Sequence, residues 1–489
     1  MSKPLPGLEP GPVPVQEDVA GWVEPIDLLE RARGTRHPVL LHSSLTTHPG
    51  ARFSIFACDP LCTLSIERGR VTRRSEGGEL DGRTVSGDLD PFAALREIAP
   101  ARSISNAAGL PFLGGAIGYL GYPIRRSIEV LPGVASDPAG LPDAWFGVYD
   151  TAVLFDHHES RVTLVASSAR GRDEPPAVRV RQRFTTLRRM LRQAAEPRSH
   201  AAPHAIGTAR QALATTTLGE YVARVQRALD YIAAGDIYQV NLSHRIVCPY
   251  RDDPVTLFRR LSERNPSPFA AFLDGGDFQI VSASPERFLS LRGDRARCAP
   301  IKGTRPRGGT PRSDERLARE LCESAKDRAE NVMIADLVRS DLGRVCAPGS
   351  VRVDGLCRLE SFATLHHLVS NVTGRVLPGR DRLDVVRALF PGGSMTGAPK
   401  VRAMEVIDEL EGEERGIYSG SLGYLSCDGG LDFNIVIRTL VCRDGMAHLR
   451  VGGGIVAESE PLAEYRESID KARALLDALR ADLRTPGAG

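Results

Sequence analysis

The 489-residue sequence lacks several features that mark other classes of protein. Its nine cysteines include no C-x-x-C pair and have no neighbouring H-x₃-H run, which argues against a disulfide framework and a zinc site. No apolar run of roughly 18 residues occurs, and the proline-rich start has no signal-peptide core. The chain has 63 basic and 61 acidic side chains, so its net charge is only +2. This balance does not indicate a basic surface that would bind nucleic acid or a membrane. We therefore expect a reduced, cytoplasmic protein that binds small molecules or other proteins.

The chain divides into unequal parts. We expect residues 1–20 to be a flexible leader and 21–193 to be a strand-rich N-terminal region, in which short apolar runs are separated by Gly, Pro and Asp. Residues 194–216 are rich in Ala, Pro, His and Ser without an apolar period, so they are predicted to be a linker. Strands and helices alternate over 217–483, the expected catalytic region.

Individual elements are predicted within these parts. Thr217 and Glu220 form a capping box ahead of an apolar helical period, which predicts the start of a helix. Further helices are predicted over 177–194, 327–342, after Pro399 and over 461–483, and a strand over 433–441.

Carboxylates are placed at helical spacing in two of the predicted helices. Asp327 and Glu330 lie three residues apart in one. Glu464 and Glu467 lie three residues apart in the other, with Lys471 on the same face. Two such faces in contact would offer the oxygen ligands that Mg²⁺ prefers. The alternative is a solvated face with Glu–Lys pairs, which is the commoner outcome for this spacing alone.

Three glycine-containing segments, 302–304, 392–400 and 451–454, are predicted to be turns. The middle one is not a P-loop, because Gly397 is followed by Ala-Pro instead of Lys-Ser or Lys-Thr. It leads into a helix with Pro399 near its first turn, so its N–H groups suit an anion such as a carboxylate. The alternative is that each segment has no binding role and contains Gly only because a tight turn requires a positive φ. Taken singly, each segment fits this alternative equally well.

Three side chains near these segments belong to the residue types that act in catalysis. Glu286 precedes a predicted strand, and Lys302 lies in the PIKGT turn. A lysine is a nucleophile only when its ammonium form is disfavoured, and a glutamate is an acid near neutrality only when its carboxylate is disfavoured. His367 ends a His-His pair in an apolar, strand-like run. Judged by residue type alone, such residues are more often structural than catalytic.

Together these segments resemble the chorismate-utilising enzymes, a family that includes anthranilate, aminodeoxychorismate, isochorismate and salicylate synthases. The resemblance runs from about residue 218 to 479, and ten motifs occur in the family's order. They are GDIYQVNL, SASPERF, PIKGT, SAKDRAEN, HHLVSNV, FPGGSMTGAPKVRAMEVIDELE, YSGSLGYLS, DFNIVIRTL, VGGGIVAES and AEYRESIDKAR. The N-terminal segments LLHSSLTTHPGARF and PFLGGAIGYLGY are similar to the ammonia-using members.

The resemblance implies a ligand set for each small molecule. Mg²⁺ is the implied cofactor, and the implied metal residues are Glu330, Glu464, Glu467 and Asp327. Chorismate is the implied substrate, with Arg438 and Tyr418 holding its enolpyruvyl carboxylate. The other implied substrate positions are Gln239, Gly303, Thr304, Ser394, Gly452, Gly453, Gly454 and Lys471.

The resemblance also implies catalytic roles. Glu286 matches the general acid that protonates the departing C4 hydroxyl of chorismate, and His367 matches a histidine near the ring. Family members that add water at C2 carry Lys at the position of Gln239, so isochorismate and salicylate synthesis are disfavoured. Lys302 stands where anthranilate synthases usually have Ala, which fits covalent attack of a lysine at C2 and entry of ammonia at C4.

Two further partners are implied. The sequence contains no Cys nucleophile motif of a glutamine amidotransferase, so the ammonia is expected from a separate glutaminase subunit. A possible tryptophan pocket would be lined by Ser43, Arg52, Phe53, Pro268 and Phe269. Gly50 and Ala51 depart from the bulkier and polar residues of the family in that pocket.

The implied fold is α+β, with two facing, mostly antiparallel sheets, helices outside them in α/β/β/α layers and the active site in a cleft. The expected activity is that of a transferase of nitrogenous groups that makes 4-amino-4-deoxychorismate for 4-aminobenzoate and folate. Anthranilate synthesis is the alternative. A catalytically silent sensor of chorismate or tryptophan is a rival of another class, and it would be expected to lack one of the catalytic groups.

Overall fold

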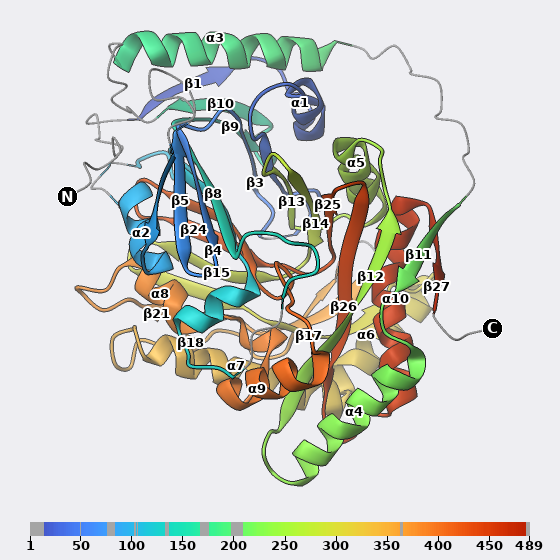
Figure 1. Ribbon diagram of the computed structural model, residues 1–489. Coiled ribbons are helices and arrows are strands. Elements are labelled where there is room, and N and C mark those ends of the chain that lie inside the picture. Colours follow the sequence, from blue (N-terminus) through green and yellow to red (C-terminus); the bar gives the residue numbers. More distant parts are fainter. Residues whose placement is uncertain are drawn as a thin grey trace.

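The computed structural model describes residues 14–48, 50–75, 84–101, 104, 106–132, 136–166, 176–196, 209–361 and 365–485. Two large β-sheets face each other at its centre, and apolar side chains from both fill the space between them. Figure 1 shows helices outside these sheets. The predicted α+β class with mostly antiparallel sheets is confirmed.

The first sheet combines strands from both predicted regions, since β2 pairs with β13. All its strand pairs are antiparallel except β11 with β27. In spatial order its strands are β1 (Val15–Val19), β10 (Arg161–Ala166), β9 (Thr151–Asp156), β3 (Phe53–Ala57), β2 (Val39–His42), β13 (Phe269–Asp274), β14 (Phe278–Ser284), β25 (Thr439–Arg443), β26 (Met446–Ile455), β12 (Gln239–Pro249), β11 (Arg210–Ala214) and β27 (Ala481–Arg484), with β22 (Gly397–Ala398) paired to β12.

The second sheet is also shared, since β7 pairs with β23. Its order is β18 (Arg352–Val353), β21 (Val372–Arg375), β16 (Arg295–Ala299), β15 (Arg287–Arg292), β24 (Leu431–Ile435), β23 (Ser421–Ser426), β7 (Gly115–Leu120), β8 (Ala144–Tyr149), β4 (Cys62–Glu67), β5 (Arg70–Ser75) and β6 (Thr84–Asp88). A small third sheet consists of β17 (Ile301–Pro306), β20 (Leu365–Val369) and β19 (Arg358–Ser361). The predicted N-terminal and catalytic regions therefore form one body.

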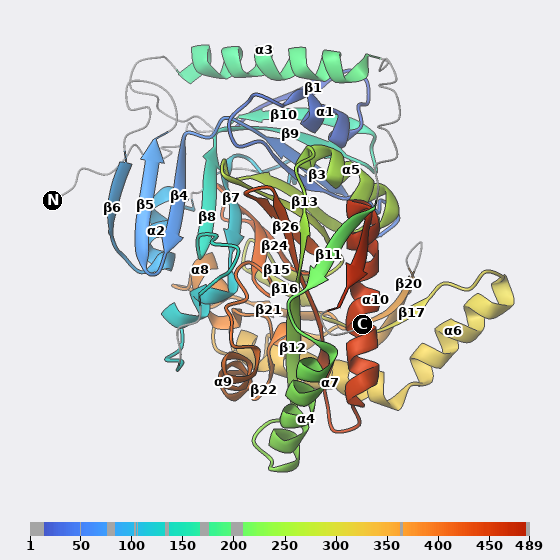
Figure 2. The same ribbon diagram turned by 45° about the vertical axis from the view of Figure 1, so that its right-hand side comes forward.

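The helices complete the layers. Side chains of α1 (Pro25–Arg31), α3 (Pro176–Ala195), α5 (Pro254–Arg264) and α10 (Pro461–Leu479) share a core with the first sheet. Those of α2 (Pro91–Ile98), α7 (Ala325–Gly343) and α8 (Arg382–Leu389) share a core with the second sheet. The remaining helices are α4 (Leu218–Ala233), α6 (Pro311–Glu323), α9 (Lys400–Glu411) and the 3₁₀ turns Tyr122–Ser127 and Gly393–Met395. Figure 2 shows α6 projecting from the body beside β17 and β20.

The predicted capping box of α4 is present, with the Thr217 hydroxyl and the Glu220 carboxylate each accepting from the other's backbone N–H. Two boundaries near the N-terminus differ from prediction. Val15–Val19 forms β1 along β10, so this part of the predicted leader is an edge strand. Backbone pairing places it there, and its largely exposed side chains gave no apolar alternation. The predicted linker, 194–216, begins inside α3 and includes all of β11, and its residues 197–208 lie outside the described residues, as do residues 1–13.

Two boundaries near the C-terminus also differ. The predicted strand over 433–441 is two strands, β24 and β25, in different sheets, because the chain crosses between the sheets at Arg438, where φ is 49°. The last helix ends at Leu479, four residues earlier than predicted. Arg480 has a left-handed φ of 55°, and the chain then enters β27.

Two of the predicted glycine turns are strands. Lys302 lies in β17, and residues 451–454 lie in β26. Glycine in β26 allows this strand to lie very close to β12. A Cβ on Gly452 would lie 1.9 Å from the carbonyl oxygen of Leu242 in β12.

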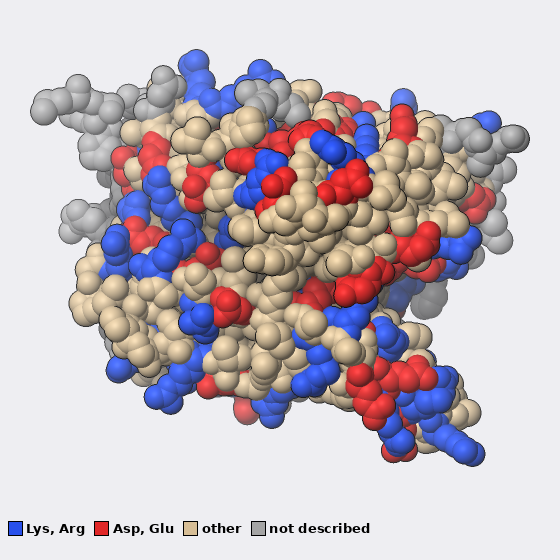
Figure 3. All heavy atoms as spheres, turned by 90° about the horizontal axis from the view of Figure 1, so that it is seen from below, with Lys and Arg blue, Asp and Glu red and all other residues tan. Residues whose placement is uncertain are grey.

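The surface gives two further observations. In the part of the chain that the structure describes, no helix is long and apolar enough to span a bilayer. Figure 3 shows basic and acidic side chains interspersed over the face seen from below.

Candidate active site

Two predicted site residues, Glu286 and Arg438, lie where the chain passes between the two large sheets. Glu286 lies between β14 of the first sheet and β15 of the second, and Arg438 lies on the return passage from β24 to β25. The two passages are hydrogen bonded to each other. The N–H of Ile435 donates to the carbonyl of Glu286 at 2.9 Å, and the N–H of Ala283 donates to the carbonyl of Arg438 at 3.0 Å. Arg438 has a positive φ, which is uncommon for a residue other than glycine. Residues in such a conformation are often found at functional sites.

Glu286 has the environment of a general acid. Its side chain is buried, and burial raises its pKa to about 7. The hydroxyl of Ser394, the ammonium of Lys302 and the N–H of Ile301, 3.4 Å from Oε1, favour the carboxylate and limit this rise. The carboxyl group is therefore part protonated near neutral pH, as an acid catalyst requires.

Lys302 points from β17 toward α7. Its Nζ lies 2.7 Å from Oε1 of Glu330, and the amide of Gln239 donates to the same oxygen. Burial alone would raise the pKa of Glu330, but the Lys302 ammonium and the Gln239 amide lower it overall. A β-bulge follows Lys302 at Gly303, where φ is 78° and a Cβ would lie 2.9 Å from the Cβ of Asp327. This close approach explains the glycine after Lys302.

His367 and Arg438 provide a neutral and a cationic group on the same side of the site. Burial and the nearby Arg438 lower the pKa of His367 to about 3, so its ring is neutral. Its Nδ1 lies 2.9 Å from the hydroxyl of Thr304. Burial lowers the pKa of Arg438, and within the described residues no carboxylate pairs with its guanidinium. An arginine in that position is suited to the carboxylate of a ligand.

Three predicted metal carboxylates surround the glycines of β26. A Cβ on Gly454 would lie 2.8 Å from Oε1 of Glu330, and one on Gly453 would lie 3.1 Å from Oε2 of Glu464. Burial and the charge of Glu467 raise the pKa of Glu464, while Lys471 lowers the pKa of Glu467. The carboxylates are therefore close enough to repel one another.

Basic side chains bind these carboxylates in the structure. Lys471 lies 2.8 Å from Glu467, and it also donates to the carbonyl of Gly452 at 3.0 Å. Across the described ranges, no three His, Cys, Asp or Glu side chains come together in a geometry that could hold a metal ion. Asp327, the fourth predicted ligand, is bound by Arg305 at 2.9 Å.

Of two remaining predicted positions, Ser394 is buried and Tyr418 is partly buried. Ser394 lies in the 3₁₀ turn of Gly393–Met395 and bonds Glu286. Burial raises the pKa of Tyr418 to about 12, so its hydroxyl is a donor at neutral pH.

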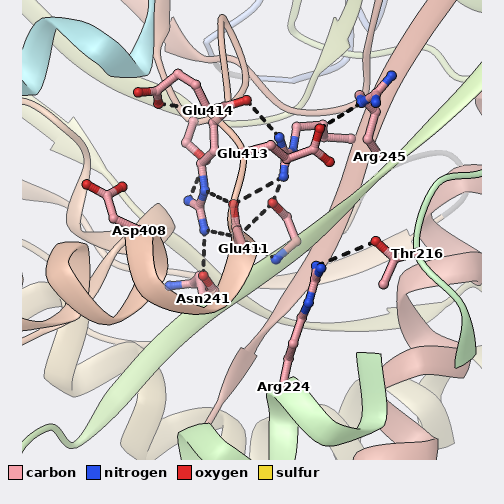
Figure 4. Close-up of polar contacts among 12 residues, drawn as sticks. Thr216, Arg224, Asn241, Arg245, Asp408, Glu411, Glu413 and Glu414 are labelled. Atoms are coloured by element: carbon pink, nitrogen blue, oxygen red, sulfur yellow. Dashed lines mark hydrogen bonds and ion pairs between the residues drawn. The ribbon is translucent and has the colours of Figure 1, made fainter. Parts of the chain in front are cut away.

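Sequence reasoning missed a buried network of charged residues behind the site, which Figure 4 shows. Its centre is Glu411, the last residue of α9, which bonds Arg415 at 2.6 and 2.9 Å and Arg450 at 3.2 Å. The N–H and hydroxyl of Ser243 in β12 donate to the same carboxylate. The four-residue spacing of Glu411 and Arg415 was the one available signal, and it is also found on ordinary helix surfaces.

The predicted tryptophan-pocket residues lie around a separate cavity of about 630 Å³ between the two large sheets. All five of them line it, together with Gly50. The Ser43 hydroxyl donates to the carbonyl of Phe53 at 2.8 Å. None of the predicted catalytic or metal residues lines this cavity.

Comparison with known proteins places the chain among its relatives. Residues 42–477 match the family model described as chorismate binding enzyme. The chain belongs to this family. It is thus a chorismate-utilising enzyme, and its site residues lie within the matched segment.

Two curated relatives within the family differ in the reaction that their names give. The chain is 42% identical over 444 residues to aminodeoxychorismate synthase component 1 of Salmonella typhimurium. The match covers 90% of this chain and 92% of the relative. It is 46% identical over 398 residues to anthranilate synthase component 1 of Streptomyces coelicolor. That match covers 80% of this chain and 78% of the relative. Among solved structures, anthranilate synthase component I of Streptococcus pneumoniae is 33% identical, with a TM-score of 0.76 over 88% of this chain and 93% of that one.

Proposed function

We propose that this chain is the large subunit of an aminodeoxychorismate synthase, which converts chorismate and ammonia to 4-amino-4-deoxychorismate for 4-aminobenzoate and folate. The observation that carries the proposal is the placement of Lys302. Its amine extends from a bulged strand into the site formed by Glu286, Glu330 and His367. A lysine amine is a nucleophile that splits one substitution into two easier steps.

The proposed first step forms a C–N bond from Lys302 to C2 of chorismate. The Lys302 ammonium, which is paired with Glu330 in the structure, first releases a proton to water. As the neutral amine then attacks C2, both ring double bonds shift by one position and the C4–O bond breaks. Glu286 gives its proton to the departing hydroxyl, which leaves as water. The carboxyl pKa of about 7 supports this assignment, because both the acid and its conjugate base are populated near neutrality.

In the proposed second step, ammonia forms a bond to C4 and the bond from C2 to Lys302 breaks. Both ring double bonds return to their original positions, and the amine of Lys302 recovers the electron pair. The product keeps its enolpyruvyl group, whose carboxylate we assign to Arg438 and Tyr418. Within the described residues no carboxylate pairs with Arg438, which supports that assignment.

Mg²⁺ is proposed as cofactor because Glu330, Glu464 and Glu467 offer the type of oxygen ligand that this cation prefers. Glu467 repels both Glu464 and Glu330, and a hard divalent cation that displaced Lys302 and Lys471 would stabilise all three carboxylates. Bound there, Mg²⁺ would neutralise the ring carboxylate of chorismate. Arg305 holds Asp327, so Asp327 is assigned to an outer position.

The ammonia is proposed to come from a separate glutamine amidotransferase in a transient heterodimer, in the cytoplasm. The purified chain alone should use ammonium and fail to use glutamine. Turnover of glutamine by the chain without a partner would contradict this part of the proposal.

Anthranilate synthesis is the second candidate, favoured by the 46% identity to the Streptomyces coelicolor enzyme. The test supplies chorismate, Mg²⁺ and ammonium and identifies the product. Fluorescent anthranilate indicates the second candidate, and 4-aminobenzoate formed after addition of the lyase indicates the first. Absence of any product would favour a catalytically silent sensor.

The covalent step has its own test. Intact-mass spectrometry with chorismate and Mg²⁺, in the absence of ammonia, should detect an adduct in the parent and none in Lys302→Ala. Lys326→Ala is the matched control, because Lys326 also approaches a predicted metal carboxylate, at 3.9 Å from Glu464, but comes from a different element. An adduct that persists in Lys302→Ala would overturn the mechanism.

A further inference from the structure

We propose that Arg415, in the loop after α9, is a positioning residue whose guanidinium holds three segments of the active site in one arrangement. The inference deepens the proposed function, since the segments are those assigned to chorismate. Arg415 touches no residue assigned to metal binding and is 3% exposed, so it acts through its neighbours.

The geometry of the guanidinium is the first observation. All five of its N–H groups have acceptors. Nε and one terminal nitrogen donate to Glu411 at 2.9 and 2.6 Å, and the same terminal nitrogen donates to the carbonyl of Asn241 at 2.6 Å. The other terminal nitrogen donates to the carbonyl of Met395 at 2.9 Å and to the hydroxyl of Ser419 at 3.0 Å.

The identity of these acceptors is the second observation. Apart from Glu411, each acceptor belongs to a segment that carries a residue assigned to the site. Ser394, which bonds Glu286, immediately precedes Met395. Gln239 lies two residues before Asn241 on β12, and Tyr418 immediately precedes Ser419. The charged carbon of Arg415 also lies 5.8 Å from the centre of the Tyr418 ring.

The charge balance is the third observation. Glu411 is buried and accepts from Arg415, Arg450 and Ser243, so the cation at position 415 has a fixed counter-charge. Figure 4 shows Glu411 at the centre of these contacts, with Asn241 on the side of β12. The carboxylate of Glu411 thereby fixes the guanidinium of Arg415, which donates to the three segments.

Such an arrangement affects the rate because small displacements of catalytic groups are costly. A misplacement of about 1 Å lowers a rate by about 100-fold. Lysine keeps the charge opposite Glu411, but its single ammonium has three donors and lacks the planar fork, so it cannot serve all the acceptors together. Arg415→Lys therefore separates the charge of Arg415 from its positioning role.

Arg125 offers a matched control. It is fully buried and pairs with Glu414 at 2.8 Å and with Asp408 at 2.6 Å. Its guanidinium lies 4.0 Å from the centre of the Tyr122 ring, and that of Arg415 lies 4.9 Å from the same ring. Among the described residues Arg125 donates to Tyr122, Glu414 and Asp408, none of which is assigned to the site.

The experiment compares Arg415→Lys with Arg125→Lys for chorismate consumption and thermal stability. Both variants should lower the unfolding temperature. Arg415→Lys should lower kcat by about 100-fold with a smaller change in KM, and Arg125→Lys should keep kcat within about threefold of the parent. Equal losses of kcat in the two variants, or a parental kcat in Arg415→Lys, would overturn the proposal.

A second readout does not depend on activity. Hydrogen exchange of residues 392–398 and 416–421 should be faster in Arg415→Lys than in the parent and unchanged in Arg125→Lys. If the parent itself consumes no chorismate, the proposed function fails while hydrogen exchange still decides the role of Arg415. Unchanged exchange in Arg415→Lys would overturn that role.

Ser419→Ala provides the test if Arg415→Lys does not fold. It removes one acceptor of Arg415 and leaves the charge pair with Glu411 intact. We expect faster exchange over residues 416–421 and a decrease in kcat of about tenfold. A Ser419→Ala variant with parental exchange and parental kcat would count against the proposal.

Discussion

The Nζ atom of Lys302 lies 2.7 Å from Oε1 of Glu330, so the proposed nucleophile and a proposed metal carboxylate are partners in one ion pair. The two side chains are only 11% and 14% exposed, which reduces the screening of their interaction. The amide of Gln239 donates to the same oxygen. An oxygen that already accepts hydrogen bonds from an ammonium and an amide is a poorer ligand for a metal ion. Pairing with Lys302 and binding of Mg²⁺ therefore compete for Glu330.

This competition predicts how Lys302 affects metal binding. Without chorismate, Lys302→Ala should bind Mg²⁺ more tightly than the parent, by about fivefold if the ion pair contributes about 1 kcal/mol. Isothermal titration calorimetry measures the difference. In a Glu330→Gln background the same lysine substitution should have no effect on affinity. Equal Mg²⁺ affinities in Lys302→Ala and the parent would show that the metal does not bind at this oxygen.

The environment of Glu286 predicts the pH dependence of the rate. The group acts as an acid, so only its protonated form is active, and burial raises its pKa to about 7. The rate should therefore fall as the pH rises through about 7, whereas a carboxyl with an ordinary pKa would already be ionised there. The Ser394 hydroxyl stabilises the carboxylate, so Ser394→Ala should move this limb to higher pH. A limb that moves to lower pH in Ser394→Ala would contradict the assignment.

The buried network predicts a large effect on stability at Glu411. Glu411→Gln leaves the buried cations of Arg415 and Arg450 without their shared counter-charge, which should cost about 3–5 kcal/mol of unfolding free energy. Glu413→Gln is the control, since Glu413 pairs with Arg245 at 3.2 Å nearer the surface and should cost less than about 1 kcal/mol. Denaturant titration measures both. Similar losses in the two variants would show that the Glu411 network adds no special stability.

Much of the secondary structure could be predicted because it follows from local patterns. Thr217 and Glu220 begin α4 through a capping box formed within four residues. The break at Arg438 could not be predicted, because the apolar pattern continues through two strands that lie in different sheets. Strand pairing across sheets depends on distant segments, and periodicity does not record it.

The site itself could be anticipated only through the family resemblance. Spacing placed Glu464 and Glu467 on one helix face, yet it gave no sign that Glu330 approaches them across β26. Likewise the burial that raises the pKa of Glu286 results from packing between segments far apart in the sequence. Arg415 illustrates the rest, because three of its five hydrogen bonds reach segments that meet only in the folded chain.

The cavity of about 630 Å³ between the large sheets predicts binding of tryptophan away from the catalytic residues. Its volume suits a small aromatic ligand, and Phe53 and Phe269 offer apolar walls. Tryptophan at about 100 times its dissociation constant should stabilise the fold by about 2.7 kcal/mol, which a thermal shift detects. Phe53→Ala should remove most of that shift, because the indole loses an aromatic wall. Threonine serves as the control ligand. An equal shift with threonine, or an unchanged shift in Phe53→Ala, would place any tryptophan outside this cavity.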